Sequence, residues 1–592
     1  MERSGSADQS AVDRPSNAGS VSRRGFLAAG VGAAALAGLT WSPAGAVPWG
    51  PQSTLAPPPD FPAGIPLSQQ AYANWSKEIV LDHVWTATAR SSDDVVTLAN
   101  WAHRNGYTVR ARGTMHGWSP LTVVPGAPVD RVLLVDTMVH LNSVEVHSDG
   151  EQSVVTAGAG ASIESILTAL QDHGLGWANS PAIGDLSIAG ALAIGAHGAT
   201  YPAAGETITP GQSFGSLSNL ITAMTVVVWD SSSGSYTLRE FARSDVESTA
   251  FLTHLGRTFV TSVTLQAGEN YRLRCQSFTD IPWQELFAPP GSPGRTYASF
   301  VEASGRVEAI WFPFTSTPWL KIWTPTPVKP PESREVHGPY NYFFSDALPE
   351  AVTTPLGMVA KGLQAATPLF GASQFGAVAA GLVLTDTDDL WGWSKDVLFY
   401  LRHTTVRVVA GGGAVITKRS NIARVIHEMT TWLNERMTHL ASMGQYPVNM
   451  PFEVRLCGVD DNGEVLVDSA GVPDLSAVRP RSDRDDWDTA IWMNVVSIPG
   501  TPGLPAFLRD MERWMVANYS GDYATFRPEW SKGWAFTNDA AYQDDEFLTR
   551  TIPATFRAGG DGNWDAALAT FDKYDPHRVF SNTFIDRFMP SA

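Results

Sequence analysis

The 592-residue chain has the composition of a large globular protein, with 44% hydrophobic and 17% charged residues, and we expect two or more domains. Its formal charge of -18 at pH 7 disfavours binding to nucleic acid or to anionic membrane surfaces, because both repel an acidic protein. The two cysteines, Cys275 and Cys457, form no CxxC or Cys/His pattern, so the sequence predicts no structural metal site and leaves one isolated disulfide open.

Residues 1–46 are typical of an export signal. The paired Arg23 and Arg24 precede an apolar stretch that is rich in alanine and glycine and ends in an A-x-A cleavage pattern at Ala44 to Ala46. This order favours a twin-arginine signal over a disordered tail, and we therefore expect a secreted protein. No other apolar run is expected to approach the roughly 20 residues that span a bilayer.

The following residues, 47–62, are too rich in proline for a helix or a central strand, so we expect an extended lead-in. The folded body is predicted to begin near Ile65. An acidic segment that starts at Ser92 and continues with apolar residues at helical spacing predicts a capped amphipathic helix, which stops at Gly106. Residues 107–111 follow as a strand.

A second unit repeats this pattern. Residues 154–157 are typical of a strand, 158–160 of a turn, and Ser162 of the cap of an apolar helix that stops at Gly174. The GxG of this turn is not a dinucleotide fingerprint, because Ile163 occupies the position of the third glycine. The sequence thus predicts an α+β protein with short mixed strands and without a Rossmann domain.

Two loops combine glycine with residues typical of a nucleotide site. The first is Arg112 to Ser119 (RGTMHGWS), and the second, over 181–198, is rich in glycine and alanine. Glycines allow the backbone to approach a ligand closely and to turn its N–H groups inward, as a diphosphate requires. The second loop alone is equally typical of tightly packed helices, and the first loop favours the ligand site. The residues with this role are Gly113, Gly117, Gly184, Gly190, Gly195 and Gly198, flanked by the small Ala189, Ala191, Ala193 and Ala196.

These loops, together with residues 255–265 (LGRTFVTSVTL), resemble the FAD domain of the vanillyl-alcohol oxidase/p-cresol methylhydroxylase family. The resemblance covers residues 63–268 and implies a two-domain fold, with an FAD-binding domain of mixed sheets and helices and a substrate cap with a large antiparallel sheet. It also implies that His116 holds FAD covalently; a histidine that only hydrogen-bonds near the flavin is the alternative. No cysteine lies where bicovalent members place a second link, so we expect one bond, and His197 as a pocket wall. The FAD-binding residues that it implies are Arg112, Gly113, Thr114, Met115, His116, Gly117, Ser119, Gly184, Asp185, Ile188, Ala189, Gly190, Gly195, Ala196, His197, Gly198, Val260, Lys532 and Asn582.

The C-terminal segment, residues 521–592, contains two further elements of this family. Residues 527–532 (RPEWSK) and 575–582 (DPHRVFSN) are similar to the R-P-H-W-x-K and D-P-x-x-x-F-x-N elements of its sugar-lactone oxidases. Glu529 stands where those enzymes have a histidine, so we expect a substrate other than an aldonolactone. The resemblance also predicts that this segment returns to the FAD domain.

Residues 269–520 are predicted to form the substrate cap. The chain has 21 tryptophans, and such a content suits either a bulky core or a wide apolar cavity. Together with the export signal, the histidine-linked flavin and the triplet Glu453-Val454-Arg455, the whole chain resembles the class II cholesterol oxidases, which carry covalent FAD. That resemblance implies oxidation of cholesterol by O2 to cholest-4-en-3-one, through cholest-5-en-3-one, with H2O2 as the second product. A polyol or sugar-lactone oxidase and a flavin-loaded binding protein without catalysis are the alternatives.

Period-2 alternation over 452–456 places Glu453 and Arg455 on one face of a strand. A surface ion pair is the ordinary interpretation of such a pattern, and the family resemblance favours a cavity above the flavin instead. The same alternation offers Glu308, from 306–310, and Asn494 to that cavity.

Oxidation of the sterol 3β-hydroxyl needs a base for its proton, and a carboxylate in an apolar pocket suits this task. Glu453 is our first choice and Glu308 the second, and either is also a candidate to carry the proton from C4 to C6 during isomerisation. Arg455 or Lys532 would stabilise developing negative charge. The resemblance further implies that the pair Glu453/Arg455 gates oxygen access. The candidate catalytic residues are therefore Glu453, Arg455, Glu308, Asn494 and Glu529.

The expected partners are small molecules, namely a sterol and O2. We expect a monomer, no nucleic acid and no metal, and the sequence leaves transient contact with membranes or lipid particles open.

Overall fold

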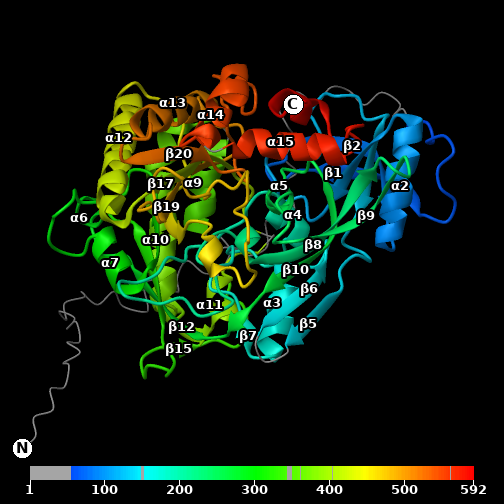
Figure 1. Cartoon of the computed structure of the whole chain (residues 1–592). Coiled ribbons are helices and arrows are strands. Elements are labelled where there is room, and N and C mark those ends of the chain that lie inside the picture. The colour runs from blue at the N-terminus through cyan, green and yellow to red at the C-terminus, as the bar shows by residue number, and fades with distance from the viewer. Residues whose placement is uncertain are drawn as a thin grey trace, which may run out of the picture. The chain divides into compact units, whose positions relative to one another are not determined.

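The computed structural model describes residues 55–148, 152–342, 350–360, 362–402, 405–560 and 562–591, so the predicted export signal lies outside the described residues. These residues form an α+β fold with an N-terminal region (55–269) and a cap region (272–528), each built around its own sheets (Figure 1). The predicted fold class is confirmed, including the large antiparallel sheet of the cap.

The described part of the proline-rich lead-in, residues 55–62, contains no helix or strand. It is nevertheless fixed to the fold, because Trp85 donates its indole N–H to the carbonyl of Ala56 (3.0 Å) and Trp101 donates to the carbonyl of Pro59 (2.9 Å). The Phe61 ring packs edge-on against Trp101. The first strand follows directly, at Leu67.

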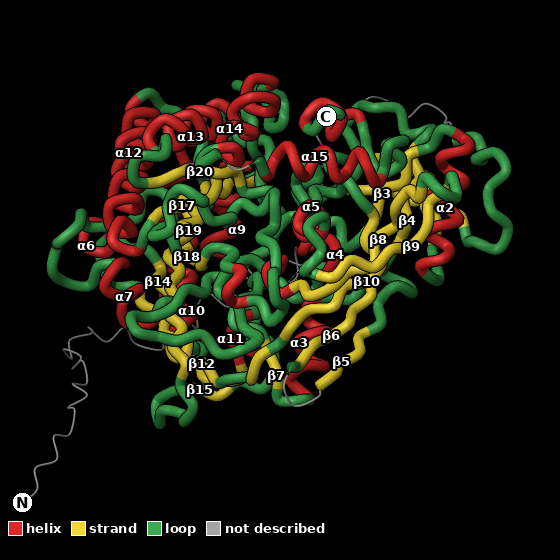
Figure 2. Tube along the Cα trace, in the orientation of Figure 1, coloured by secondary structure: helices red, strands yellow, loops and turns green. Residues whose placement is uncertain are grey.

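Two sheets organise the N-terminal region, and Figure 2 shows the larger one as a twisted group of strands. In the first, β2, β4 and β3 are parallel and β1 is antiparallel to β2. The second is antiparallel throughout. In spatial order the first contains β1 (Leu67–Ala73), β2 (Val80–Thr88), β4 (Val132–Asp136) and β3 (Thr108–Arg112), and the second contains β5 (Val144–Ser148), β6 (Ser153–Gly158), β10 (Phe259–Gln266), β8 (Ile221–Asp230) and β9 (Ser235–Ala242). A short pair, β7 (Leu175–Gly176) and β11 (Gly268–Glu269), completes the region.

The predicted helices of this region are present. Helix α2 (Ser92–Asn105) ends at Gly106, which adopts the left-handed conformation (φ 66°), as expected. Its cap is Ser91 rather than Ser92, because the Ser91 hydroxyl accepts the backbone N–H of Asp94. Helix α3 (Ile163–Asp172) is capped by Ser162 as predicted. The shorter helices are α4 (Ile188–Ala193) and α5 (Ser248–Leu252).

The cap is built on one long sheet, antiparallel except for its first pair. Both faces are largely buried, so strands such as β17 and β19 have no exposed residue. In spatial order the strands are β15 (Arg334–Glu335), β16 (Asp389–Trp393), β12 (Arg272–Phe278), β14 (Trp319–Pro325), β13 (Arg306–Trp311), β18 (Phe452–Gly458), β19 (Thr489–Ser497), β17 (Val409–Thr417) and β20 (Ala524–Pro528). The cap helices are α6 (Trp283–Leu286), α7 (Tyr297–Ser304), α9 (Glu350–Ala360), α10 (Thr367–Leu384), α11 (Ser394–Leu398), α12 (Ile422–Ser442) and α13 (Leu504–Asn518).

One expectation about apolar segments is wrong. Among the described residues, the helical segment Gln364–Leu384 is long and apolar enough to cross a membrane. This segment comprises a short 3-10 turn and helix α10 of the cap.

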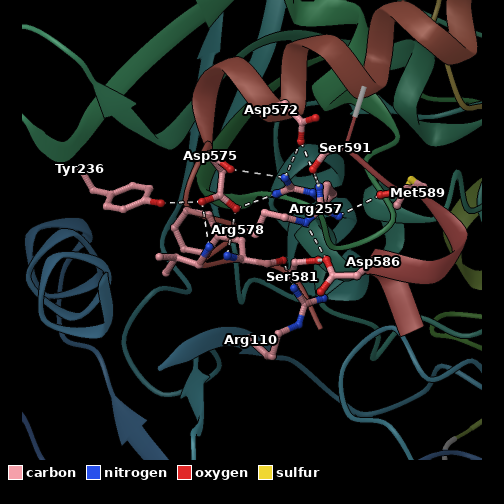
Figure 3. Close-up of polar contacts among 12 residues, drawn as sticks. Arg110, Tyr236, Arg257, Asp572, Asp575, Arg578, Ser581, Asp586, Met589 and Ser591 are labelled. Carbon is pink, nitrogen blue, oxygen red and sulfur yellow. Dashed lines mark hydrogen bonds and ion pairs between the residues drawn. The ribbon is translucent and has the colours of Figure 1, made fainter. Parts of the chain in front are cut away.

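The chain returns to the N-terminal region after β20. A π-helical turn (Phe547–Thr551) leads into α14 (Ile552–Arg557), which packs on β20, while α15 (Asn563–Tyr574) packs on β8 and α5 and is followed by α16 (Thr583–Phe588). Figure 3 shows the polar network that fixes this return, centred on Arg257 and Asp575. The Asp575 carboxylate also accepts the hydroxyl of Tyr236 and the backbone N–H groups of Val579 and Phe580.

The two cysteines do not pair. Cys275 and Cys457 are both free and buried, which decides the question that the sequence left open. Cys457 accepts the indole N–H of Trp492 at 3.0 Å.

Candidate active site

A single cavity of about 490 Å³ has walls from both regions. The N-terminal region contributes the loop after β3 and the segment around α4, and the cap contributes β18, α9 and α10. The cavity therefore joins the two glycine-containing loops of the sequence to the charged face of the cap sheet.

The first loop is held in place by the segment after β1. Trp75 donates its backbone N–H to the carbonyl of Gly117 (3.2 Å), and the Asn74 side chain donates to the carbonyl of Trp118 (2.8 Å). The His116 ring lies against the Trp75 ring, with 3.8 Å between their centroids. Met115 adopts a left-handed conformation (φ 56°), which turns the loop sharply just before the histidine. Every residue from Arg112 to Ser119 lines the cavity.

The second loop packs on the first and on α3. A Cβ at Gly113 would lie 2.2 Å from the Ser187 hydroxyl oxygen, so the glycine allows the two loops to meet. A Cβ at Gly198 would lie 2.2 Å from the carbonyl oxygen of Ser180. Glycine at these two positions therefore allows close packing of the loops.

The predicted cofactor residues divide into two groups by position. Those that line the cavity are Arg112, Gly113, Thr114, Met115, His116, Gly117, Ser119, Ala189, Gly190, Ala196, His197, Val260 and Lys532. Those that do not line it are Gly184, Asp185, Ile188, Gly195, Gly198 and Asn582. Asn582 caps α16 and donates to the carbonyls of Pro120 and Leu121, so it supports the first loop from outside.

The residues present fit an FAD. The wall formed by Ala189, Gly190, Ala193 and Ala196 offers little side-chain bulk, and a Cβ at Gly117 would meet nothing within 4 Å. A flavin dinucleotide needs such a narrow, backbone-lined path. His116 lies on this path and provides an imidazole nitrogen to which a flavin could be bonded. Neither Cys275 nor Cys457 lines the cavity.

The register of the cap sheet assembles the predicted catalytic residues. Strand pairing places Glu308 opposite both Lys321 and Arg455, and places Glu453 opposite Asn494. Side chains directly opposite one another on one face lie close together. Accordingly, Arg455 Nε lies 3.3 Å from Glu308 Oε1, and its terminal nitrogen pairs with Glu453. Burial acts to lower the pKa of Arg455, but the two carboxylates outweigh it and raise that pKa.

Glu529, which directly follows β20, completes the polar group. Asn494 donates its side-chain N–H to Glu529 (2.8 Å), and the Ser531 hydroxyl donates to the other carboxylate oxygen (2.7 Å). His197, which stacks on Trp492, lies 3.6 Å from the same carboxylate. Burial would raise the pKa of Glu529, but the Lys532 ammonium and His197 hold it well below its usual value.

Sequence reasoning missed two residues of this group, the half-buried Tyr400 and the buried Lys321. The Tyr400 hydroxyl donates to Glu308 at 2.5 Å, and Lys321 lies 4.0 Å from the same carboxylate. The Lys321 ammonium lies over the Tyr400 ring, and burial lowers its pKa to about 8. A lone lysine inside the apolar strand Trp319–Pro325 was the available signal for Lys321.

Of the predicted catalytic residues, Glu453, Arg455 and Glu529 line the cavity, whereas Glu308 and Asn494 lie directly behind them. The rest of the cap wall is mainly apolar. Its apolar members are Phe312, Trp319, Leu356, Phe370, Ala377, Val378, Leu401, Val406, Val408, Ala410, Met450, Pro451 and Val496.

A backbone-lined path that carries a histidine, joined to an apolar chamber with a charged end, defines a two-domain flavin-dependent oxidoreductase. Residues 85–210 match the family described as FAD binding domain. Residues 272–590, more than half of the chain, match the family described as cholesterol oxidase, substrate-binding, and the chain belongs to that family.

Solved structures agree with this assignment. The chain is similar to a cholesterol oxidase from Brevibacterium sterolicum, with 54% identity over 91% of this chain and 100% of that one, and a TM-score of 0.89. A histidine-to-alanine mutant of that enzyme gives the same values. A protein described as a solvent-stable cholesterol oxidase is 48% identical over 90% of this chain and 100% of its own, also with a TM-score of 0.89.

A curated relative matches over a shorter stretch. It is a long-chain alcohol oxidase from an uncultured marine euryarchaeote, 27% identical over 178 residues, which are 30% of this chain. The match spans 33% of that relative's length.

Proposed function

We propose that this protein is a secreted FAD-dependent oxidase that converts cholesterol to cholest-4-en-3-one by way of cholest-5-en-3-one. One observation carries the proposal: a single cavity connects the His116 loop to an apolar chamber, and charged Glu453, Arg455 and Glu529 lie on its wall. An apolar chamber suits a sterol ring system and disfavours the alternative of a polyol or sugar lactone.

His116 is proposed to bind the flavin covalently. When bound, FAD would accept the hydride from sterol C3 and transfer both electrons to O2, which leaves as H2O2. The contact of His116 with Trp75 fixes the direction of the imidazole within the loop. The mutant among the similar structures, which replaces a histidine of the Brevibacterium sterolicum enzyme, is in keeping with a special role for one histidine.

Glu453 is proposed to accept the proton of the 3β-hydroxyl. It lines the cavity, whereas Glu308 lies behind Arg455 and is held by the Tyr400 hydroxyl. Glu308 therefore remains the second candidate, with a path to the cavity through Tyr400, which lines it. A base must reach the proton that it abstracts, and this geometric criterion places Glu453 first.

The cations have separate tasks in this proposal. Arg455 faces the substrate chamber and would stabilise negative charge on the sterol oxygen. Lys532 lies over the Trp118 ring of the first loop, at 4.5 Å, and so faces the flavin side. Because Arg455 is held between Glu453 and Glu308, a change in this pairing would open or close the chamber wall, and we propose that it gates oxygen access.

Isomerisation needs one carboxylate to take a proton from C4 and to return one at C6. We propose that the same group, Glu453 or Glu308, performs both transfers. The step is balanced, because the double bond moves from C5 to C4 and the sterol neither gains nor loses atoms.

The decisive experiment is anaerobic addition of cholesterol to the purified yellow protein, followed through the visible absorption of the oxidised flavin. Bleaching, with the yellow colour retained in an acid-precipitated pellet, supports a histidine-linked sterol oxidase. A flavin that stays oxidised with cholesterol and bleaches with a polyol or lactone contradicts the proposal.

Export through the twin-arginine route, a monomeric state and transient contact with lipid surfaces are also proposed. The first rests on the order of features in residues 1–46 and the last on the insolubility of the substrate. A periplasmic or culture-medium fraction that lacks the protein would contradict export.

A further inference from the structure

Helix α10 has two faces with different surroundings. The segment Gln364–Leu384 is apolar enough to cross a membrane, yet only 39% of its most apolar stretch is buried. No charged side chain occurs between Gly362 and Leu384. A helix at the surface of a soluble protein ordinarily carries charged or polar residues on its outward side.

The inner face of α10 belongs to the cavity. Phe370, Gln374, Ala377 and Val378 line the chamber, at the helical spacing expected of one face. Phe370 and Val378 are buried. This helix is therefore part of the wall between the apolar chamber and the outside.

The outer face of α10 is apolar and exposed. It consists of Leu369, Ala372, Gly376 and Val383, which follow one another at helical spacing, together with Leu384, and it continues into the preceding turn with Leu363 and Ala365; all are exposed. Leu369 is 56% exposed, Val383 75% and Leu384 60%. A contiguous exposed apolar surface of this kind marks an interaction site, whereas single apolar residues scattered over a surface do not.

The patch continues beyond the helix. The exposed Phe314 packs edge-on against the Tyr446 ring, and Tyr446 donates its backbone N–H to the Gln364 side chain. Leu363, Phe314 and Tyr446 thus border the start of the helix with further apolar and aromatic surface.

We propose that the outer face of α10 docks the protein on a neutral phospholipid surface, from which the sterol passes to the chamber behind the helix. The proposal rests on the proposed sterol substrate, which partitions into lipid. It commits to a zwitterionic surface, because the outer face offers no cation to anionic headgroups and the chain carries a formal charge of -18. An apolar helix face that enters the headgroup boundary binds in proportion to its buried apolar area.

The test compares substitutions on this face with matched substitutions elsewhere. Leu369→Glu and Val383→Glu introduce a charge on the outer face, and neither residue lines the cavity. Val328→Glu and Val246→Glu are the controls, because these valines are 80% and 87% exposed at sites outside the patch. Flavin content and melting temperature confirm that each variant is folded, and Leu369→Phe tests whether an apolar replacement retains docking.

Two measurements are made on the holoenzyme. The first is flotation with phosphatidylcholine vesicles, with and without cholesterol. The second is the rate of sterol oxidation, from the same vesicles and from a cyclodextrin solution. We expect about tenfold weaker flotation and slower vesicle turnover for the two outer-face variants, with unchanged cyclodextrin turnover, wild-type behaviour of both controls and retention by Leu369→Phe. Addition of phosphatidylserine should weaken flotation of the wild-type protein.

Equal flotation and vesicle turnover of Leu369→Glu and wild type would overturn the docking proposal. It would also be overturned if the wild type were a dimer that Leu369→Glu converts to a monomer while no form binds vesicles. If the wild-type protein did not oxidise cholesterol supplied in cyclodextrin, that result would instead contradict the proposed function. The flotation measurement would still test docking independently.

Discussion

The guanidinium of Arg257 lies 2.6 Å from the carboxylate of Asp575, although 318 residues separate them in the chain. Both side chains are buried. Arg257 comes from the turn before β10, and Asp575 follows α15, so this pair fastens the returning C-terminal segment to the region that carries the His116 loop.

Asp575→Asn should destabilise the protein by about 3 kcal/mol, because it leaves a buried guanidinium without its main counter-charge. Chemical denaturation followed by tryptophan fluorescence measures the loss. Asp586→Asn is the matched control, since Asp586 pairs with Arg578 near the surface, where an ion pair contributes about 1 kcal/mol or less. An equal loss of unfolding free energy in the two variants would show that the buried pair stabilises the protein no more than the surface pair does.

His116→Ala should release the flavin from the protein when it is precipitated with acid. The reason is that no other residue is proposed to bond it, and neither cysteine lines the cavity. The measurement is the visible absorption of pellet and supernatant. His197→Gln serves as the control and should leave the colour in the pellet, since His197 is assigned to the wall; a yellow pellet from His116→Ala would refute the assignment of the bond.

Glu453→Gln should lower kcat for sterol oxidation by about 100-fold or more, in the range that a lost general base produces. Glu308→Gln should have a smaller effect on oxidation, because Glu308 does not line the cavity and contacts it only through Arg455 and Tyr400. Flavin bleaching follows oxidation, and the ultraviolet absorption of the conjugated enone follows isomerisation. A larger loss of bleaching rate in Glu308→Gln than in Glu453→Gln would reverse the order of the two carboxylates.

The oxygen dependence of Glu453→Gln should also change, because the substitution removes one of the two carboxylates that hold Arg455. Reoxidation of the reduced enzyme at several oxygen concentrations measures this step separately from hydride transfer. Reoxidation that is unchanged at every concentration would contradict a gate at this pair.

The free energy of unfolding should decrease as the pH is lowered below about 6.5, because of His254. This residue lines the cavity and accepts the backbone N–H of Gly256 on Nδ1. Burial, with a contribution from Arg110, lowers the pKa of His254 to about 3. The unfolded chain, whose histidine has its ordinary pKa, therefore binds the extra proton first as pH falls, and folding stability decreases by about 1.4 kcal/mol per pH unit.

His254→Asn keeps an acceptor for Gly256 and removes this titration. Between pH 7 and pH 5 the variant should lose about 2 kcal/mol less than the wild type, as measured by denaturant midpoints at both values. His140→Asn, at an exposed position, should leave the wild-type difference intact. The same pH difference in wild type and His254→Asn would exclude His254 as the source.

Local sequence signals were sufficient for several elements. Helix α3 begins after the predicted cap, Ser162, because a serine hydroxyl that accepts a backbone N–H is a local interaction. Period-2 alternation likewise placed Glu453 and Arg455 on one face of β18, since pleating depends only on the strand itself. The cap of α2 was displaced by one residue, to Ser91, because two adjacent serines offer the same hydroxyl.

The residues that the sequence did not reveal depend on contacts across strands. Lys321 and Tyr400 lie beside Glu308 only because β14 and β13 pair in this register and the segment after α11 lines the cavity. The outer face of α10 was missed for a related reason: an apolar sequence is equally suited to a buried helix, and only exposure in the fold distinguishes the two.

The sequence by itself predicted the α+β class, because caps, turns and strand periodicity are encoded in neighbouring residues, and its resemblance to a flavoprotein family predicted the roles of the His116 loop and of the candidate carboxylates. Tertiary structure decided which of those residues reach the cavity, that the two cysteines remain apart, and that Arg455 lies between two carboxylates. The physical reason is that strand register and the packing of loops such as Gly113 on Ser187 are settled by the whole core, to which residues hundreds of positions apart contribute.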